Sequence, residues 1–309
     1  HEKFKSIIDN GGFDVVIGNP PYGAELEEKE KKYLKLKFNE DKTNNTASLF
    51  IFLGYSVLKD NGNISFIVPK QLTYTSAWTG TRKLLIRNNL RYVIDSSEAF
   101  EDVELEQIIF ILNKHKKEDK RVIVGFSNKG KIIESKSNIK YFTDQRFPLW
   151  ITDDNYSIFE KILNNSVNLK EIAKVNWGGL VAKYLSKNQT ADSIPCLRGR
   201  EVQRYYTTSE YFIKKKYIDN FYYVKGKKLI FQRIVCRYGE KIIANYRNAR
   251  IVGTYANDDN YADKTVTLIW DSKVNLKFLL ALFNSKLINW FAHRYLWNRS
   301  QLTMEFMYE

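Results

Sequence analysis

The segment Asn19-Pro20-Pro21-Tyr22 combines residue types that could act on a planar amino group. Two successive prolines fix the backbone, so the Pro20 carbonyl oxygen and the Asn19 side-chain oxygen can form a rigid pair of acceptors. An exocyclic amine or amide nitrogen is a poor nucleophile, and two acceptors that bind its hydrogens favour the charge that develops as a methyl group arrives. Tyr22 offers a ring face for a flat substrate. The alternative interpretation is a Pro-Pro turn with a surface tyrosine.

The elements around this segment are expected to place it where ligands bind. Phe13–Gly18 is a short apolar, β-branched run that predicts a buried strand ending at the prolines. The elements expected next are a helix over Ala47–Lys59, a strand over Ile64–Val68, a helix over Thr81–Arg87 and a strand over Tyr92–Ile94. This alternation predicts a parallel α/β sheet, and open sheets of this kind bind ligands beyond the carboxyl ends of their strands. A further strand, Gln107–Leu112, follows a short connection that permits antiparallel pairing.

A different kind of sequence begins after Phe147-Pro148 and predicts a second domain. A helix over Asp153–Leu163, with an aspartate N-cap, leads to a boundary near Asn165. The expected domains are therefore residues 1–164 and 165–309. Within the second domain, the apolar runs predict four short strands and one helix: Leu229–Val235, Lys241–Ala244, Ile251–Tyr255, Thr265–Trp270, and the helix Leu276–Trp290 with one apolar face.

The charge of the chain favours a polyanionic partner. Its 309 residues contain 49 Lys and Arg and 35 Asp and Glu, a net charge of +14. Residues 1–150 contain 24 Lys and Arg and 20 Asp and Glu, a net charge of +4. Residues 151–309 contain 25 Lys and Arg and 15 Asp and Glu, a net charge of +10. Such a field attracts nucleic acid and, more weakly, an anionic membrane. The alternative is a lysine-rich composition with solvated faces.

Basic and aromatic residues interleave between Arg198 and Lys228, a mixture that can neutralise phosphates and stack on bases. The expected phosphate contacts are Arg198, Arg200, Arg204, Lys214, Lys215 and Lys216. The two cysteines and three scattered histidines predict neither a disulfide framework nor a metal site, and a reducing, cytoplasmic setting fits. The sequence has no transmembrane-length apolar run, and its start, without Met or signal peptide, suggests a fragment.

Phe13–Gly23 resembles the catalytic motif of amino-methyltransferases. The order of the later segments resembles the TaqI-type N6-adenine DNA methyltransferases (gamma class) and the related type IIG restriction-modification enzymes. The tetrad alone is also similar to that of glutamine-modifying and some RNA-guanine methyltransferases. Ile194–Val202 looks like the entry to a TaqI-like specificity domain. The resemblance implies a partial Rossmann-like methyltransferase sheet followed by an α+β target-recognition domain.

The resemblance also implies roles for two further aromatics. Phe50 stands where the family places a ring against the adenine of S-adenosylmethionine, beside Asn19 and Pro21, although a core aromatic is an equal alternative. Phe100 stands where a second ring would stack with Tyr22 on an adenine flipped out of the duplex. The alternative for Phe100 is a residue that only anchors its acidic loop.

The family's glycine-rich turn and ribose-binding acidic residue lie upstream of Phe13, and this sequence contains neither. We therefore expect an incomplete S-adenosylmethionine site, weak or no cofactor binding by this chain alone, no activity alone, and one unpaired sheet edge. An upstream methyltransferase half or a partner subunit would complete the sheet. The leading hypothesis is site-specific adenine-N6 methylation of double-stranded DNA in a restriction-modification system. The alternatives are a non-catalytic DNA-binding specificity subunit and a methyltransferase acting on RNA or a protein glutamine.

Overall fold

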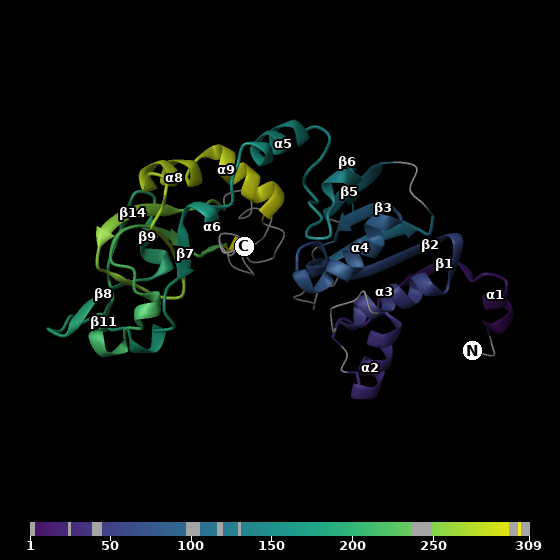
Figure 1. Cartoon of the computed structure of the whole chain (residues 1–309), viewed down its shortest axis with the longest axis horizontal. Coiled ribbons are helices and arrows are strands. Elements are labelled where there is room, and N and C mark those ends of the chain that lie inside the picture. Colours follow the sequence, from purple (N-terminus) through teal and green to yellow (C-terminus); the bar gives the residue numbers. More distant parts are fainter. Residues whose placement is uncertain are drawn as a thin grey trace. The chain divides into compact units, whose positions relative to one another are not determined.

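The computed structural model describes residues 4–23, 26–38, 45–96, 106–115, 120–128, 131–236, 249–296 and 302–303 (Figure 1). The chain divides into two compact units, unit 1 (His1–Glu160) and unit 2 (Lys161–Glu309). The division falls inside helix α5 (Tyr156–Asn164). Within the described ranges, no helix combines the length and the apolar character needed to cross a membrane.

Unit 1 is built on one six-stranded sheet in the order β1-β2-β4-β3-β5-β6. The strands are β1 (Phe13–Gly18), β2 (Leu58–Pro69), β3 (Asn89–Asp95), β4 (Gln107–Asn113), β5 (Arg121–Asn128) and β6 (Lys131–Asn138). β1 runs parallel to β2 and β3 parallel to β5, whereas β4 lies antiparallel between β2 and β3. The α/β class is confirmed, and so is the antiparallel pairing that the short connection before β4 permits.

Helices cover one face of this sheet. The helices of unit 1 before α5 are α1 (Lys5–Asp9), α2 (Glu28–Lys37), α3 (Thr46–Ser56) and α4 (Thr79–Arg87). α3 packs on β2 and α4 on β3, and Ile51, Phe110 and Leu85 lie in the core between helices and sheet. The connections include three 3₁₀ turns: η2 (Lys70–Thr73), η3 (Ser76–Trp78) and η4 (Ile139–Tyr141).

The helix expected to reach Lys59 ends at Ser56, because the following residues pair with the sheet. The Asn61 N–H donates to the Lys114 carbonyl at 2.9 Å, and the Lys114 N–H donates to the Gly62 carbonyl at 2.8 Å. Asn61 adopts a positive φ of 64°, which asparagine tolerates better than most residues. Residues 59–62 are therefore an irregular part of β2. β5 and β6 were not predicted from the sequence.

Unit 2 is an α+β unit centred on a four-stranded sheet in the order β14-β12-β16-β7. These strands are β14 (Gly253–Asp258), β12 (Gly226–Gln232), β16 (Val266–Trp270) and β7 (Lys174–Trp177). Leu229 and Phe231 face a core that includes α6 (Leu169–Ile172) and α8 (Leu276–Phe283), whereas Ile230 faces a second core. Alternation along β12 thus buries both faces of the sheet.

Smaller sheets complete unit 2. A three-stranded sheet has the order β11-β8-β15, and two further strand pairs are β9 with β10 and β13 with β17. Their strands are β8 (Ser193–Leu197), β9 (Val202–Gln203), β10 (Tyr206–Thr207), β11 (Phe212–Lys214), β13 (Ile234–Cys236), β15 (Tyr261–Ala262) and β17 (Leu302–Thr303). The expected strand over Lys241–Ala244 lies outside the described residues.

Two expected helices have different bounds. The single helix predicted over Leu276–Trp290 is two helices, α8 and α9 (Lys286–Phe291), because the Ser285 hydroxyl accepts the Ile288 N–H at 3.2 Å and caps a new helix start. Leu287 on α9 is half exposed at 50%. The helix predicted from Asp153 begins at Tyr156, after a turn in which Asn155 accepts the Thr152 N–H at 3.1 Å.

Candidate active site and nucleic-acid interface

The tetrad Asn19–Tyr22 follows the carboxyl end of β1 and is held there by the start of α3. The Thr46 hydroxyl donates to the Pro21 carbonyl at 2.8 Å, and the Asn45 side-chain amide donates to the Tyr22 carbonyl at 3.1 Å. Asn45 also caps α3, since its side-chain oxygen accepts the Ala47 N–H at 2.9 Å. The positioning roles of Asn45 and Thr46 were not predicted from the sequence, although an asparagine directly before an apolar helical run is a typical N-cap signal.

A hydrogen bond within the tetrad orients the Asn19 side chain. The Tyr22 hydroxyl donates to Asn19 Oδ1 at 2.7 Å and lies 3.4 Å from the Ile67 carbonyl oxygen on β2. The Tyr22 ring is half-buried against the core of unit 1, and burial raises the pKa of Tyr22, so the hydroxyl keeps its proton. Asn19 itself is exposed. Because an amide oxygen has two lone pairs, Asn19 Oδ1 can accept a second hydrogen from a ligand.

Of the two aromatic residues that the sequence predicts beside the tetrad, the structure describes only Phe50. Phe50 is 41% exposed on α3, one helical turn after Thr46, so the core-aromatic alternative is wrong. A contact between Phe50 and a nucleoside cofactor stays a prediction. Phe100 lies outside the described residues, and its stacking with Tyr22 stays a prediction.

The carboxyl ends of β2 and β3 carry a buried charge cluster, which we call the Lys70 cluster and define as Lys70, Asp95 and Glu106. Lys70 Nζ lies 2.7 Å from Asp95 Oδ2 and 3.4 Å from Glu106 Oε2, and each side chain is at most 9% exposed. Opposite charges removed from water in this way are strongly coupled. Both described carboxylates of this cluster form ion pairs with Lys70. An S-adenosylmethionine site that is incomplete in this chain stays a prediction.

Nearly all the net charge belongs to unit 2. Unit 2 contains 25 Lys and Arg against 12 Asp and Glu, a net +13, whereas unit 1 contains 24 against 23, a net +1. The predicted phosphate contacts Lys214, Lys215 and Lys216 are exposed, at the end of β11 and in the 3₁₀ turn that follows it. A strongly basic unit that follows a nearly neutral one in the chain fits a division into nucleic-acid binding and chemistry.

The predicted arginines have three different environments. Arg198 Nε lies 3.5 Å from the buried Asp263 carboxylate, while the exposed Arg200 donates to the Tyr211 hydroxyl at 2.5 Å. Both guanidinium groups lie over the Tyr211 ring, at 5.1 and 5.5 Å from its centre. Arg204 is half-buried and donates to the Asn284 carbonyl at the end of α8. For Arg204 the structure thus shows a structural contact, and a phosphate contact stays a prediction.

Arg204→Lys is expected to destabilise unit 2 by about 1–2 kcal/mol, because an ammonium group cannot reproduce the hydrogen bond of the planar guanidinium to the Asn284 carbonyl. Urea denaturation followed by tryptophan fluorescence measures this change. The matched control is Arg200→Lys at an exposed position, where we expect a change within about 0.5 kcal/mol. Equal stability of both variants would contradict a structural role for Arg204.

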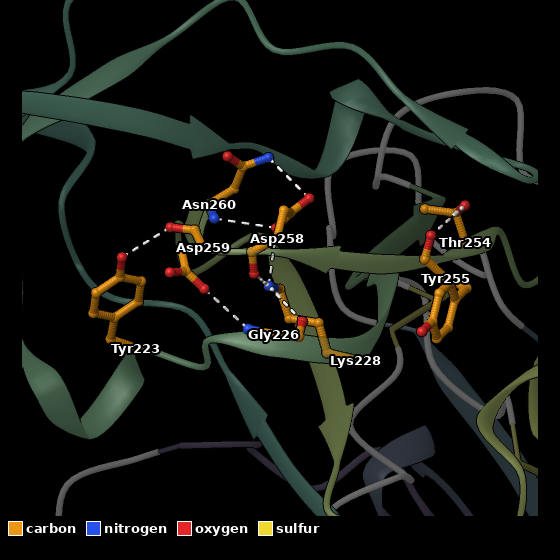
Figure 2. A network of polar contacts seen from close by, with 8 residues as sticks. All are labelled: Tyr223, Gly226, Lys228, Thr254, Tyr255, Asp258, Asp259 and Asn260. Carbon is orange, nitrogen blue, oxygen red and sulfur yellow. Dashed lines mark hydrogen bonds and ion pairs between the residues drawn. The ribbon is translucent and has the colours of Figure 1, made fainter.

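Lys228 belongs to the basic segment but lies inside unit 2 (Figure 2). Its side chain is 1% exposed, and its ammonium group lies 2.9 Å from Asp258 Oδ1 and also donates to the Asp258 carbonyl. Asp259 on the same turn accepts the Gly226 N–H at 3.1 Å. This network ties the start of β12 to the end of β14, so Lys228 is not available to a phosphate.

Comparisons with known proteins agree with this division. Residues 1–101 match the Eco57I restriction-modification methylase family, and residues 194–309 match the TaqI-like C-terminal specificity domain. A Methanocaldococcus jannaschii protein described as a type II restriction enzyme and methyltransferase is 30% identical over 93% of this chain and 26% of its own length. The type II methyltransferase M.VspI of a Vibrio species is 22% identical over 62% of this chain and 48% of its own length. The chain thus spans between about a quarter and a half of these relatives.

The fold has a known counterpart. The type IIL restriction-modification enzyme MmeI, solved in complex with DNA, superposes with a TM-score of 0.59 at 10% identity, over 88% of this chain and 42% of that one. At this identity the likeness concerns the fold alone. With its methylase segment over residues 1–101 and its specificity domain over residues 194–309, the chain belongs to the TaqI-type methyltransferases that carry a C-terminal specificity domain.

Proposed function

We propose that the chain carries the amine-binding and DNA-recognition parts of a site-specific adenine-N6 DNA methyltransferase of a restriction-modification system. One observation carries the proposal: at the carboxyl end of β1, the exposed Asn19 oxygen is oriented by the Tyr22 hydroxyl at 2.7 Å. The type II methyltransferases among its relatives, and the concentration of charge in unit 2, support duplex DNA as the substrate. Residues 165–309 would then read the target and residues 1–164 would act on it.

Asn19 and Pro20 would act on the amino group by accepting its hydrogens. As the nitrogen forms its new bond it becomes positively charged, and two fixed acceptors stabilise that charge without reorganising. The Tyr22 ring and, by resemblance, Phe100 would stack on the base after it leaves the duplex, which offsets the lost stacking. S-adenosylmethionine would supply the methyl group, with Phe50 and Pro21 on its side of the site.

The edge of the sheet supports a further methyltransferase segment beside β1. In the described part of the chain β1 pairs with β2 alone, and Val15 and Ile17 are 60% and 79% exposed. Val16 packs on the core, so alternation turns Val15 and Ile17 to the opposite face. Apolar side chains along a free strand edge favour pairing with another strand. We infer that strands of an upstream half, or of a partner subunit, add here and complete the cofactor site.

The isolated chain is accordingly expected to bind S-adenosylmethionine weakly or not at all. Isothermal titration of the isolated chain and of the complete protein, under the same conditions, measures the difference. Micromolar binding by the isolated chain would contradict an incomplete site. The control is duplex DNA at low salt, which we expect the chain to bind through unit 2 without the added segment.

The function is tested by sequencing the DNA of cells that express the complete protein, with a method that detects modified bases directly. We expect N6-methyladenine at one recurring sequence and none in cells that lack the gene. Modified cytosine would contradict adenine specificity. Unmodified DNA, together with methylated RNA or methylated protein glutamine, would overturn DNA as the substrate.

A further inference from the structure

Unit 2 contains a short hairpin, Val202–Thr207, which we call the Tyr205 hairpin. Its two strands are β9 and β10, and Tyr206 pairs with Gln203. Arg204 and Tyr205 form the two-residue connection between the strands. The hairpin therefore ends in an arginine and a tyrosine, followed by a second tyrosine.

The backbone of Tyr205 has an unusual conformation for a bulky residue. Its φ is +74°, a region in which turns ordinarily place glycine or asparagine. The other described non-glycine residues with positive φ are Asn61 and Asp271, whose short polar side chains suit this conformation. Tyrosine has no such local compensation. Backbone preference therefore does not explain a tyrosine at the tip of this hairpin.

Packing does not explain it either. Tyr205 is 65% exposed and Tyr206 is 59% exposed, so both rings project mainly into solvent. The Arg204 guanidinium carbon lies 5.6 Å from the centre of the Tyr205 ring, a contact of modest strength at an exposed site. A strained and exposed aromatic of this kind fits a contact with a ligand, since such strain concentrates at binding sites.

The base of the hairpin is firmly held. Val202 is buried, and its carbonyl accepts the Gln232 side-chain amide at 2.7 Å. The Thr208 N–H donates to the Glu201 carbonyl at 2.9 Å, and Arg204 donates to the Asn284 carbonyl. These contacts tie the hairpin to β12 and to the end of α8. The Tyr205 ring is thus presented from a fixed support, which reduces the entropy lost when it binds.

We propose that Tyr205 is a wedge that stacks against a base step of the bound duplex. The inference rests on the proposed function, which gives duplex DNA as the partner. The net charge of +13 on unit 2 matches the negative charge of the DNA phosphates. Proteins that distort DNA insert apolar or aromatic side chains between base pairs while basic residues hold the phosphates. A ring contact of this kind adds affinity that does not depend on counterion release, unlike the contacts of lysines.

The test uses the complete protein and a duplex with its recognition sequence, taken from the modified DNA or, failing modification, selected from a random duplex pool. Tyr205→Gly keeps the backbone conformation and removes the ring, whereas Tyr205→Phe keeps the ring. Tyr205→Gly is expected to weaken binding by about 10- to 100-fold with an unchanged dependence on salt concentration. Tyr205→Phe and the control Phe221→Ala, at an exposed aromatic in the same unit, should stay within about twofold of wild type.

A 2-aminopurine base placed in turn at each position of the duplex reports where the ring stacks. We expect a fluorescence change at one base step with the wild-type protein and with Tyr205→Phe, and its loss with Tyr205→Gly. Wild-type affinity of Tyr205→Gly, or an equal loss in Phe221→Ala, would overturn the inference. If the protein binds duplex DNA selectively but does not modify it, the proposed function is overturned. The Tyr205 variants still test the wedge in that case. No duplex binding at low salt would overturn both.

Discussion

Asn19→Ala in the complete protein is expected to lower the rate of methyl transfer by about 10²- to 10³-fold, the effect of removing one preorganised group that stabilises charge in a transition state. The amide oxygen of Asn19 is exposed and is oriented by Tyr22 at 2.7 Å, so the loss concerns an acceptor already in place. Transfer of a labelled methyl group to duplex DNA under single-turnover conditions measures the rate. DNA affinity, which the proposed function assigns to unit 2, should change by less than about twofold.

Tyr22→Phe tests the contribution of the Tyr22 hydroxyl separately from that of the Asn19 oxygen that it orients. This variant keeps the ring and Asn19 but removes the hydroxyl that orients Asn19 Oδ1, so we expect a smaller loss of about tenfold, the equivalent of one hydrogen bond. The loss should appear in the rate of transfer rather than in DNA affinity. A rate for Asn19→Ala within tenfold of wild type would contradict the role of Asn19. An equal loss in both variants would assign the main effect to Tyr22.

Lys70→Met is expected to destabilise unit 1 by about 3–5 kcal/mol, because it removes a buried cation that forms ion pairs with two buried carboxylates. Asp95 and Glu106 lie 2.7 and 3.4 Å from the Lys70 ammonium group, and their side chains are 3% and 8% exposed. Urea denaturation followed by tryptophan fluorescence, to which the buried Trp78 of unit 1 contributes, measures the change.

Two controls distinguish the buried cluster from an ordinary ion pair. Lys83→Met removes a cation 3.6 Å from Asp144 at a more exposed site, with side chains 44% and 33% exposed, and is expected to cost about 0–1 kcal/mol. The triple variant Lys70→Met, Asp95→Asn, Glu106→Gln removes all the charges and should recover most of the stability lost in Lys70→Met. If Lys70→Met costs no more than Lys83→Met, the Lys70 cluster does not stabilise unit 1.

Elements with strong local signals were predicted from the sequence. β1 is a mainly apolar run followed by two prolines, and α4 and β4 follow equally clear patterns, so their type and order were predicted correctly. The expectation that β1 is buried was wrong for this chain, in which Asp14, Val15 and Ile17 are exposed. The bounds were less predictable where pairing or capping competes with the local pattern. α3 ends early because residues 59–62 pair beside Lys114, and Ser285 divides the last expected helix into α8 and α9. β5 and β6 were missed altogether.

By itself, the sequence determined the chemistry of the tetrad and the basic character of the second half, because residue type and the rigidity of proline are local properties. The tertiary structure alone decided how Asn19 is used. Asn45 and Thr46 hold the tetrad from more than twenty positions away, and the Tyr22 hydroxyl meets Asn19 only because its ring packs on the core. The tertiary structure also decided that Arg204 bonds to the end of α8 and that Tyr205 has a positive φ. The contacts of Asn45, Thr46 and Arg204 join residues distant in the chain, so no local pattern encodes them.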